Sequence, residues 1–126
     1  MRLIKNNHAE IITKTIPGIS SISAAAALND FDLVKKGETL IIKECSSSES
    51  ELTTLIRESK EKKTVLAIMK VGKRWNLVSE TLKKGDIIKK SLIALNVGTP
   101  DQIIQYASQY KNDFMPYFSL ILIRFD

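Results

Sequence analysis

The stretch TVLAIMKV at residues 64–71 constrains the fold most, because it is almost wholly apolar and rich in β-branched side chains. A strand with one face in water alternates polar and apolar residues, whereas a continuous apolar run is typical of a strand covered on both faces. The run is far shorter than the roughly 18 to 20 residues that cross a bilayer. The sequence therefore predicts a strand in the middle of a layered protein.

Further apolar runs of strand length recur along the chain, and residues 101–107 (DQIIQYA) are ambiguous between a strand and another short element. Stretches with helical spacing separate several of these runs, a pattern that favours an α/β fold. The predicted strands are 11–16, 38–45, 64–71, 91–97 and 117–125.

Three helices are predicted from capping residues and apolar spacing. The first spans about residues 20–28, with Ser20 or Ser21 as its N-cap and a run of alanines that favours helix. The second lies within residues 46–63, where a serine with a glutamate three places on forms the capping-box pattern and Leu52, Leu55 and Ile56 share one face. The third covers residues 73–84, with Trp75, Val78 and Leu82 at helical spacing and Gly85 at its end.

These elements predict a single α/β domain over residues 1–126. Its sheet is expected to be mixed and largely parallel, with about five strands and helices on both faces, and the final strands could run antiparallel. At 126 residues the chain is long enough to bury one core.

Charge and cysteine content narrow the function classes. The formal net charge is +5, but the lysines occur as scattered doublets where helices meet strands, which favours solvated helix ends over a nucleic-acid surface. No stretch of residues has the length of a membrane span or the apolar core of a secretion signal. The one cysteine, Cys45, cannot form an internal disulfide, so we expect a cytoplasmic protein.

The usual catalytic and metal-binding motifs are missing from the sequence. There is no G-x-G-x-x-G, no P-loop, no H-E-x-x-H and no cysteine pair for zinc. His8 lies in a polar stretch, where an exposed surface residue is expected, and Cys45 is expected to be a small buried residue rather than a nucleophile. Trp75 is expected to pack against the sheet.

Three loops each follow a predicted strand and each contain a glycine: residues 17–21, 69–73 and 96–100. Ligands of α/β sheets lie at the carboxyl ends of strands, and glycine lets a ligand approach the main chain closely. The loops could form a pocket built from main-chain groups, or they could be the turns that any α/β domain needs. In the last strand, either Tyr117 with Ser119 or Phe118 could face a cleft.

Four motifs in order resemble the C-terminal half of the tetrapyrrole methylase family and span nearly the whole chain. They are IPGISSISAAAAL at 16–28, AIMKVGK at 67–73, GTPDQ at 98–102 and PYFSLILIR at 116–124. Within that family, MKVG and PYFSL are most similar to the branch that methylates C-20 of precorrin-2 or cobalt-factor II in cobalamin biosynthesis.

The resemblance implies two α/β domains in tandem, with S-adenosylmethionine in the cleft between them and a homodimer as the assembly. The glycine-rich loop of the family's N-terminal domain has no counterpart here. The resemblance therefore implies a C-terminal domain without its N-terminal partner, inactive alone. A free-standing α/β module that binds a small ligand or a protein is the alternative.

The resemblance also implies site residues, none of them catalytic and none a metal ligand. Cofactor contacts are implied for Met69, Gly98, Thr99 and Pro17, with the register at Val97 and Gly98 open by one residue. Contacts to the tetrapyrrole are implied for Gly18, Ser20, Ser21, Lys70 and Lys73, with Arg74 as a further anchor for substrate carboxylates.

Overall fold

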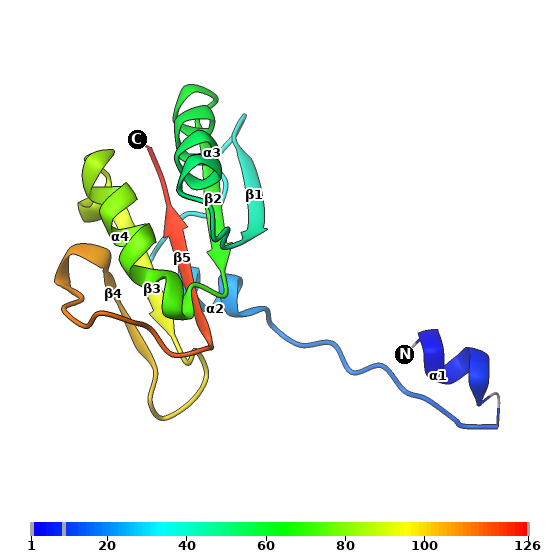
Figure 1. The fold of residues 1–126 in the computed structure, drawn as a ribbon. Helices are drawn as coiled ribbons and strands as arrows, with labels where there is room; N and C mark the ends of the chain where they lie inside the picture. The colour runs from blue at the N-terminus through cyan, green and yellow to red at the C-terminus, as the bar shows by residue number, and fades with distance from the viewer. Residues whose placement is uncertain (1, 9, 126) are drawn as a thin grey trace.

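A computed structural model describes residues 2–8 and 10–125, which form one five-stranded sheet with helices on both faces. The strand order is β1-β2-β5-β3-β4 (Figure 1). The strands are β1 Thr39–Glu44, β2 Thr64–Met69, β3 Ser91–Leu95, β4 Ile103–Tyr106 and β5 Ser119–Ile123. The prediction of a mixed α/β fold is confirmed, and the ambiguous segment 101–107 contributes β4.

Strand direction departs from the largely parallel sheet that we expected. Only β1 and β2 pair in parallel, with Thr39 opposite Thr64, while the other three pairs are antiparallel. The reason is that β5 enters between β2 and β3 in the opposite direction, with Ile121 paired to both Ile68 and Ile93. Since β5 is antiparallel to both neighbours, β1, β2 and β3 still point the same way and end at one edge of the sheet.

Each face of the sheet has its own core. Helices α3 (Glu49–Glu61) and α4 (Trp75–Lys84) cover one face, and α2 (Ser21–Leu28) covers the other (Figure 1). Successive residues of β5 alternate between the two cores, so that Ile121 packs under α3 and α4 while Leu122 packs under α2. All six residues of β2 except Met69 are buried, as its apolar sequence predicts.

The helix boundaries follow the capping residues. Ser20 caps α2 by accepting the Ser23 N–H at 3.2 Å. At α4, Gly85 is the C-cap but has φ −82°, and the left-handed residue is Asp86 with φ 54°. Two 3₁₀ turns, Gly72–Arg74 and Ile88–Lys90, flank α4, and a third, Ala107–Gln109, follows β4.

The cap of α3 gives a first prediction. Ser48 accepts the Glu51 N–H at 3.4 Å, and the Glu51 carboxylate accepts from the Ser46 hydroxyl instead of closing a capping box. Replacing Ser48 by alanine leaves this helix N–H without its cap. Ser48→Ala should therefore lower the free energy of unfolding by about 1 kcal/mol in urea titrations. Thr53→Ala, at an exposed position one turn inside the helix, is the control and should not lower it.

The predicted strand at residues 11–16 is wrong. Residues 12–20 carry no secondary structure and form an extended arm, which leads away from the sheet to a short helix, α1 (Arg2–Asn7) (Figure 1). Ile12 is 98% exposed, and Ile16 and Ile19 are more than 80% exposed. A strand exists only when it is paired, and no strand in the described part of the chain lies along this segment.

Candidate functional site

The loops that follow β2 and β3 meet at the sheet edge where both strands end. Both loops contain residues in the left-handed region: Lys70 (φ 56°), Gly72 (φ 43°), Asn96 (φ 48°) and Gly98 (φ 83°). Residues other than glycine rarely adopt this conformation, and it concentrates at functional sites. The strand-end loops thus turn sharply and bring main-chain groups to this edge.

A pocket of about 360 Å³ opens beside these two loops. Its walls are mostly apolar and come from α2, the ends of β2 and β3, and the start of β5. The lining residues are Ser21, Met69, Lys70, Ala94, Asn96, Val97, Thr99, Tyr117, Phe118, Ser119 and Leu120. We call this the strand-end pocket.

The start of β5 holds both loops in place. The Lys70 N–H donates to the Ser119 carbonyl at 2.9 Å, and the Asn96 N–H donates to the Phe118 carbonyl at 2.8 Å. In addition, the Gly72 N–H donates to the Ser119 hydroxyl at 2.8 Å, and Ser119 is buried. These bonds fix the pocket floor before any ligand arrives, which lowers the cost of ordering on binding.

The loop after β3 is held by its own side chains. The Thr99 hydroxyl donates to the Asn96 carbonyl at 2.8 Å, and the Gly98 N–H donates to Gln102 Oε1 at 2.9 Å. A Cβ at Gly98 would meet no atom of the described chain within 4 Å, so the requirement for glycine here comes from φ 83°.

A second, cationic hollow of about 600 Å³ adjoins the strand-end pocket and shares Lys70 and Tyr117 with it. Lys73 and Arg74 line it from the 3₁₀ turn, and Phe114 lines it as well. Phe114 and Tyr117 are about 70% exposed, and the Lys70 ammonium lies 3.5 Å from the Glu44 carboxylate. The hollow thus presents aromatic surface beside positive charge.

Several of the residues singled out from the sequence come together here. Met69, Lys70, Thr99 and Ser21 all line the strand-end pocket, and Lys73 lines the adjoining hollow.

The other singled-out residues lie elsewhere. Ser20 caps α2, while Pro17 and Gly18 lie in the exposed arm. Gly98 sits between two lining residues, Val97 and Thr99, without being one itself.

The start of β5 and the two residues before it contribute more to the site than the sequence predicted, which was either Tyr117 with Ser119 or Phe118. Tyr117 and Phe118 both line the strand-end pocket, and their rings meet edge to face with centroids 5.1 Å apart. Strand alternation had placed them on opposite sides, but β5 begins only at Ser119, so alternation does not govern them. Asn96 belongs to the loop at residues 96–100 that was singled out from its place after an apolar strand, although no specific role was predicted for it.

Cys45, Trp75 and His8 lie as the sequence predicts. Cys45 is 3% exposed, and burial is the main cause that raises the pKa of its thiol, against the opposing effect of Arg74. Trp75 packs in the core, edge to face with Tyr110 at 5.5 Å, and His8 is exposed. Within residues 2–8 and 10–125, no group of three or more acidic, histidine or cysteine residues could hold a metal ion.

The chain matches the family described as Tetrapyrrole (Corrin/Porphyrin) Methylases over residues 1–108. No curated protein sequence matches the chain. In the part of the chain that the structure describes, no helix combines the length and hydropathy needed to cross a bilayer.

Solved structures share the fold. The methyltransferase CobJ has a TM-score of 0.64 and 19% identity, and the match covers 98% of this chain and 56% of that one. The cobalt precorrin-4 methyltransferase CbiF, described as a cobalamin biosynthetic enzyme, has a TM-score of 0.66, 18% identity and the same coverages. The precorrin-6Y methylase CbiE from Archaeoglobus fulgidus has a TM-score of 0.52 and 19% identity, covering 96% and 55%. The chain spans just over half the length of these proteins.

Proposed function

Because this chain belongs to the tetrapyrrole methylase family, we propose that it is the C-terminal part of an S-adenosylmethionine-dependent methyltransferase that acts on a tetrapyrrole. The observation that carries the proposal is the strand-end pocket, since Met69 and Thr99, which the sequence motifs assign to the cofactor, line it together. The C-20 position of precorrin-2 or cobalt-factor II is the proposed methyl acceptor, in a cytoplasmic homodimer, on the strength of MKVG and PYFSL.

The strand-end pocket suits the adenine part of the cofactor. Met69, Val97 and Leu120 offer apolar walls to a flat ring, and Asn96 and Thr99 add polar atoms at the rim. Its volume of about 360 Å³ is at the low end for small-molecule sites. The pocket therefore fits the ring part of the cofactor, and the remaining contacts fall to another domain.

The adjoining hollow suits the tetrapyrrole. Phe114 and Tyr117 offer exposed aromatic side chains to a flat macrocycle, and Lys70, Lys73 and Arg74 offer charges that pair with its carboxylates. Because Lys70 and Tyr117 belong to both cavities, cofactor and substrate would meet along this shared wall. We propose that these two side chains orient the macrocycle toward the methyl donor.

The proposed chemistry needs few ionisable residues. When bound, S-adenosylmethionine supplies a methyl group on a sulfonium: the bond to the tetrapyrrole carbon forms as the carbon–sulfur bond breaks, and sulfur keeps the electron pair. If the accepting carbon carries a hydrogen, it then loses that hydrogen as a proton to solvent. The residues of this chain bind, orient and exclude water, and orientation contributes about 7–11 kcal/mol in ideal cases.

The exposed arm suggests where the remaining half docks. Ile12, Ile16 and Ile19 are the most exposed large apolar residues described, and the arm backbone is extended. An extended segment can add to the edge of a sheet through main-chain hydrogen bonds. We propose that this arm pairs with the sheet of an N-terminal methyltransferase domain.

Two measurements test the proposal. The chain alone should bind S-adenosylhomocysteine weakly, on the order of 1 mM, with amide NMR shifts concentrated at Met69 and Asn96–Thr99. The chain produced together with the N-terminal half of a tetrapyrrole methylase should transfer one methyl group to precorrin-2 or cobalt-factor II, detected by mass spectrometry. Shifts confined to other surfaces, together with no transfer, would contradict the proposal and favour the binding-module alternative.

A further inference from the structure

A third concave surface lies at the opposite end of the sheet from the strand-end pocket. It has a volume of about 790 Å³ and is bordered by Thr64 and Val65 at the start of β2 and by Arg124 just after β5. The strand-end pocket instead contacts the other ends of these strands, at Met69 and Leu120. We call this surface the lysine cleft.

Most of the net charge of the protein gathers around the lysine cleft. Five of its lining residues are cationic, namely Lys35, Lys36, Lys60, Lys63 and Arg124, and one, Glu38, is anionic. Their sum is +4, against +5 for the whole chain, so the rest of the protein is nearly neutral. Two lysine doublets that looked like separate helix ends in the sequence, at 35–36 and 62–63, each contribute to this one cleft.

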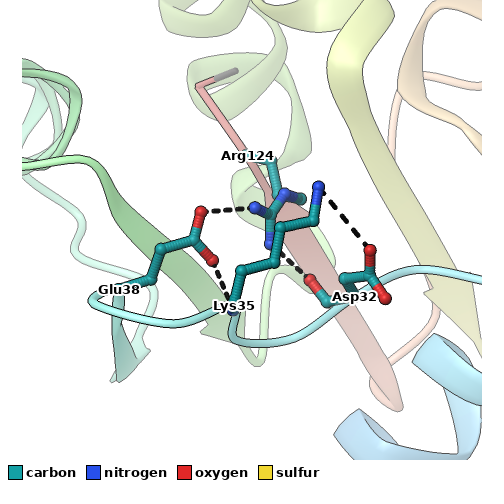
Figure 2. A network of polar contacts seen from close by, with 4 residues as sticks. All are labelled: Asp32, Lys35, Glu38 and Arg124. Atoms are coloured by element: carbon teal, nitrogen blue, oxygen red, sulfur yellow. Dashed lines mark hydrogen bonds and ion pairs between the residues drawn. The ribbon is translucent and has the colours of Figure 1, made fainter.

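The single carboxylate of the cleft is already engaged. Glu38 pairs with the Arg124 guanidinium at 2.5 Å and accepts the Lys35 N–H at 2.7 Å (Figure 2). Arg124 also donates to the Asp32 carbonyl at 2.6 Å, and the Lys35 ammonium lies 3.6 Å from the Asp32 carboxylate. Glu38 and Asp32 are therefore directed at Arg124 and Lys35.

Lys36, Lys60 and Lys63 differ from these two cations. Within the described part of the chain, no ion pair involves any of the three. Compensation of the α3 dipole accounts for Lys60 and Lys63, which lie at the carboxyl end of that helix. It does not account for Lys36, which comes from the loop before β1, or for the hollow between the two elements.

We propose that the lysine cleft binds a small polyphosphate anion. Lysine ammonium groups act as compact point charges and are common phosphate ligands, and a phosphate group carries more negative charge than a single carboxylate. The one arginine that lines the cleft, Arg124, donates to the Glu38 carboxylate and to the Asp32 main-chain carbonyl. The cleft volume lies within the range of small-molecule sites and is larger than one phosphate group requires.

Calorimetric titration with inorganic triphosphate tests the proposal. We expect binding that weakens as salt rises. The double variant Lys36→Gln with Lys63→Asn should weaken it at least about fivefold, because two charges next to the anion are removed. Asparagine suits position 63 because the backbone there is left-handed, with φ 50°. The matched control, Lys14→Gln with Lys89→Asn, removes the same charge outside the cleft and should leave the affinity unchanged.

Further outcomes distinguish a free phosphate chain from a nucleotide and show which results would overturn the proposal. Equal affinities for triphosphate and ATP would show that the cleft recognises the phosphate chain alone. Tighter binding of ATP, with amide shifts at Lys36 and Lys63, would show that the ligand is a nucleotide. No binding of triphosphate, equal loss in the control variant, or tighter binding of citrate would overturn the proposal. Since shifts from S-adenosylhomocysteine are expected at the other end of β2, this proposal and the methyltransferase proposal fail separately.

Discussion

A Thr99→Trp variant is expected to lose methyl transfer by roughly 100-fold or more when the chain is joined by its N-terminal half. Thr99 is exposed at the rim of the strand-end pocket, where its hydroxyl fixes the loop through the Asn96 carbonyl. An indole at this position would fill much of a pocket of about 360 Å³ and remove that hydrogen bond. The cofactor ring would then be displaced from its productive position.

The controls separate a blocked pocket from a damaged fold. Thr99→Ser keeps the hydroxyl and the space and should retain most of the transfer rate. Because residue 99 is exposed, the melting temperature of Thr99→Trp should stay within a few degrees of the parent. Normal transfer by the tryptophan variant, measured with methyl-labelled cofactor, would exclude the strand-end pocket as the cofactor site.

The sequence predicts the individual elements well because their signals are local. The apolar run of β2, the serine cap of α3 and the spacing of Trp75, Val78 and Leu82 each depend on residues a few positions apart. Those elements form where expected, and their apolar residues face the core. Local capping and periodicity were sufficient evidence for them.

Strand order and direction could not be predicted in the same way, because they depend on contacts between distant residues. The placement of β5 between β2 and β3 requires Ile121 to pair with Ile68 and Ile93, and an apolar run such as SLILI is compatible with any interior position. The strand predicted at residues 11–16, which is part of the extended arm, was wrong for a related reason. Its β-branched residues favour a strand, but pairing needs a partner that the described chain does not provide.

The candidate site was predictable only in part for the same physical reason. Loops that follow strands of one direction meet at one sheet edge, so Met69, Lys70 and Thr99 could be grouped from the sequence. Tyr117 and Phe118 enter the same pocket from the start of an antiparallel strand, whose position depends on the sheet order.

Removal of the Glu38 side chain should lower the stability of the protein more than Ser48→Ala or Glu44→Gln. The side chains of Arg124 and Glu38 are only 10% and 17% exposed, and their pairing joins the end of β5 to the loop before β1 (Figure 2). Glu38→Ala would remove the Glu38 carboxylate from beside a mostly buried guanidinium. Breaking one partner of a buried pair costs about 3–5 kcal/mol, so the variant should melt roughly 10 °C or more below the parent.

A double variant shows whether the loss comes from the orphaned charge. Glu38→Leu combined with Arg124→Met replaces both partners by apolar side chains and should recover most of the stability in urea titrations, since apolar replacements of buried pairs are often neutral. Glu44→Gln removes an exposed pair with Lys70 and should change the unfolding free energy by less than about 1 kcal/mol. If Glu38→Ala were as mild as Glu44→Gln, the Arg124 pair would be no more than a surface contact, and the loop before β1 would be held by the packing of Phe31 and Leu33 under α2 instead.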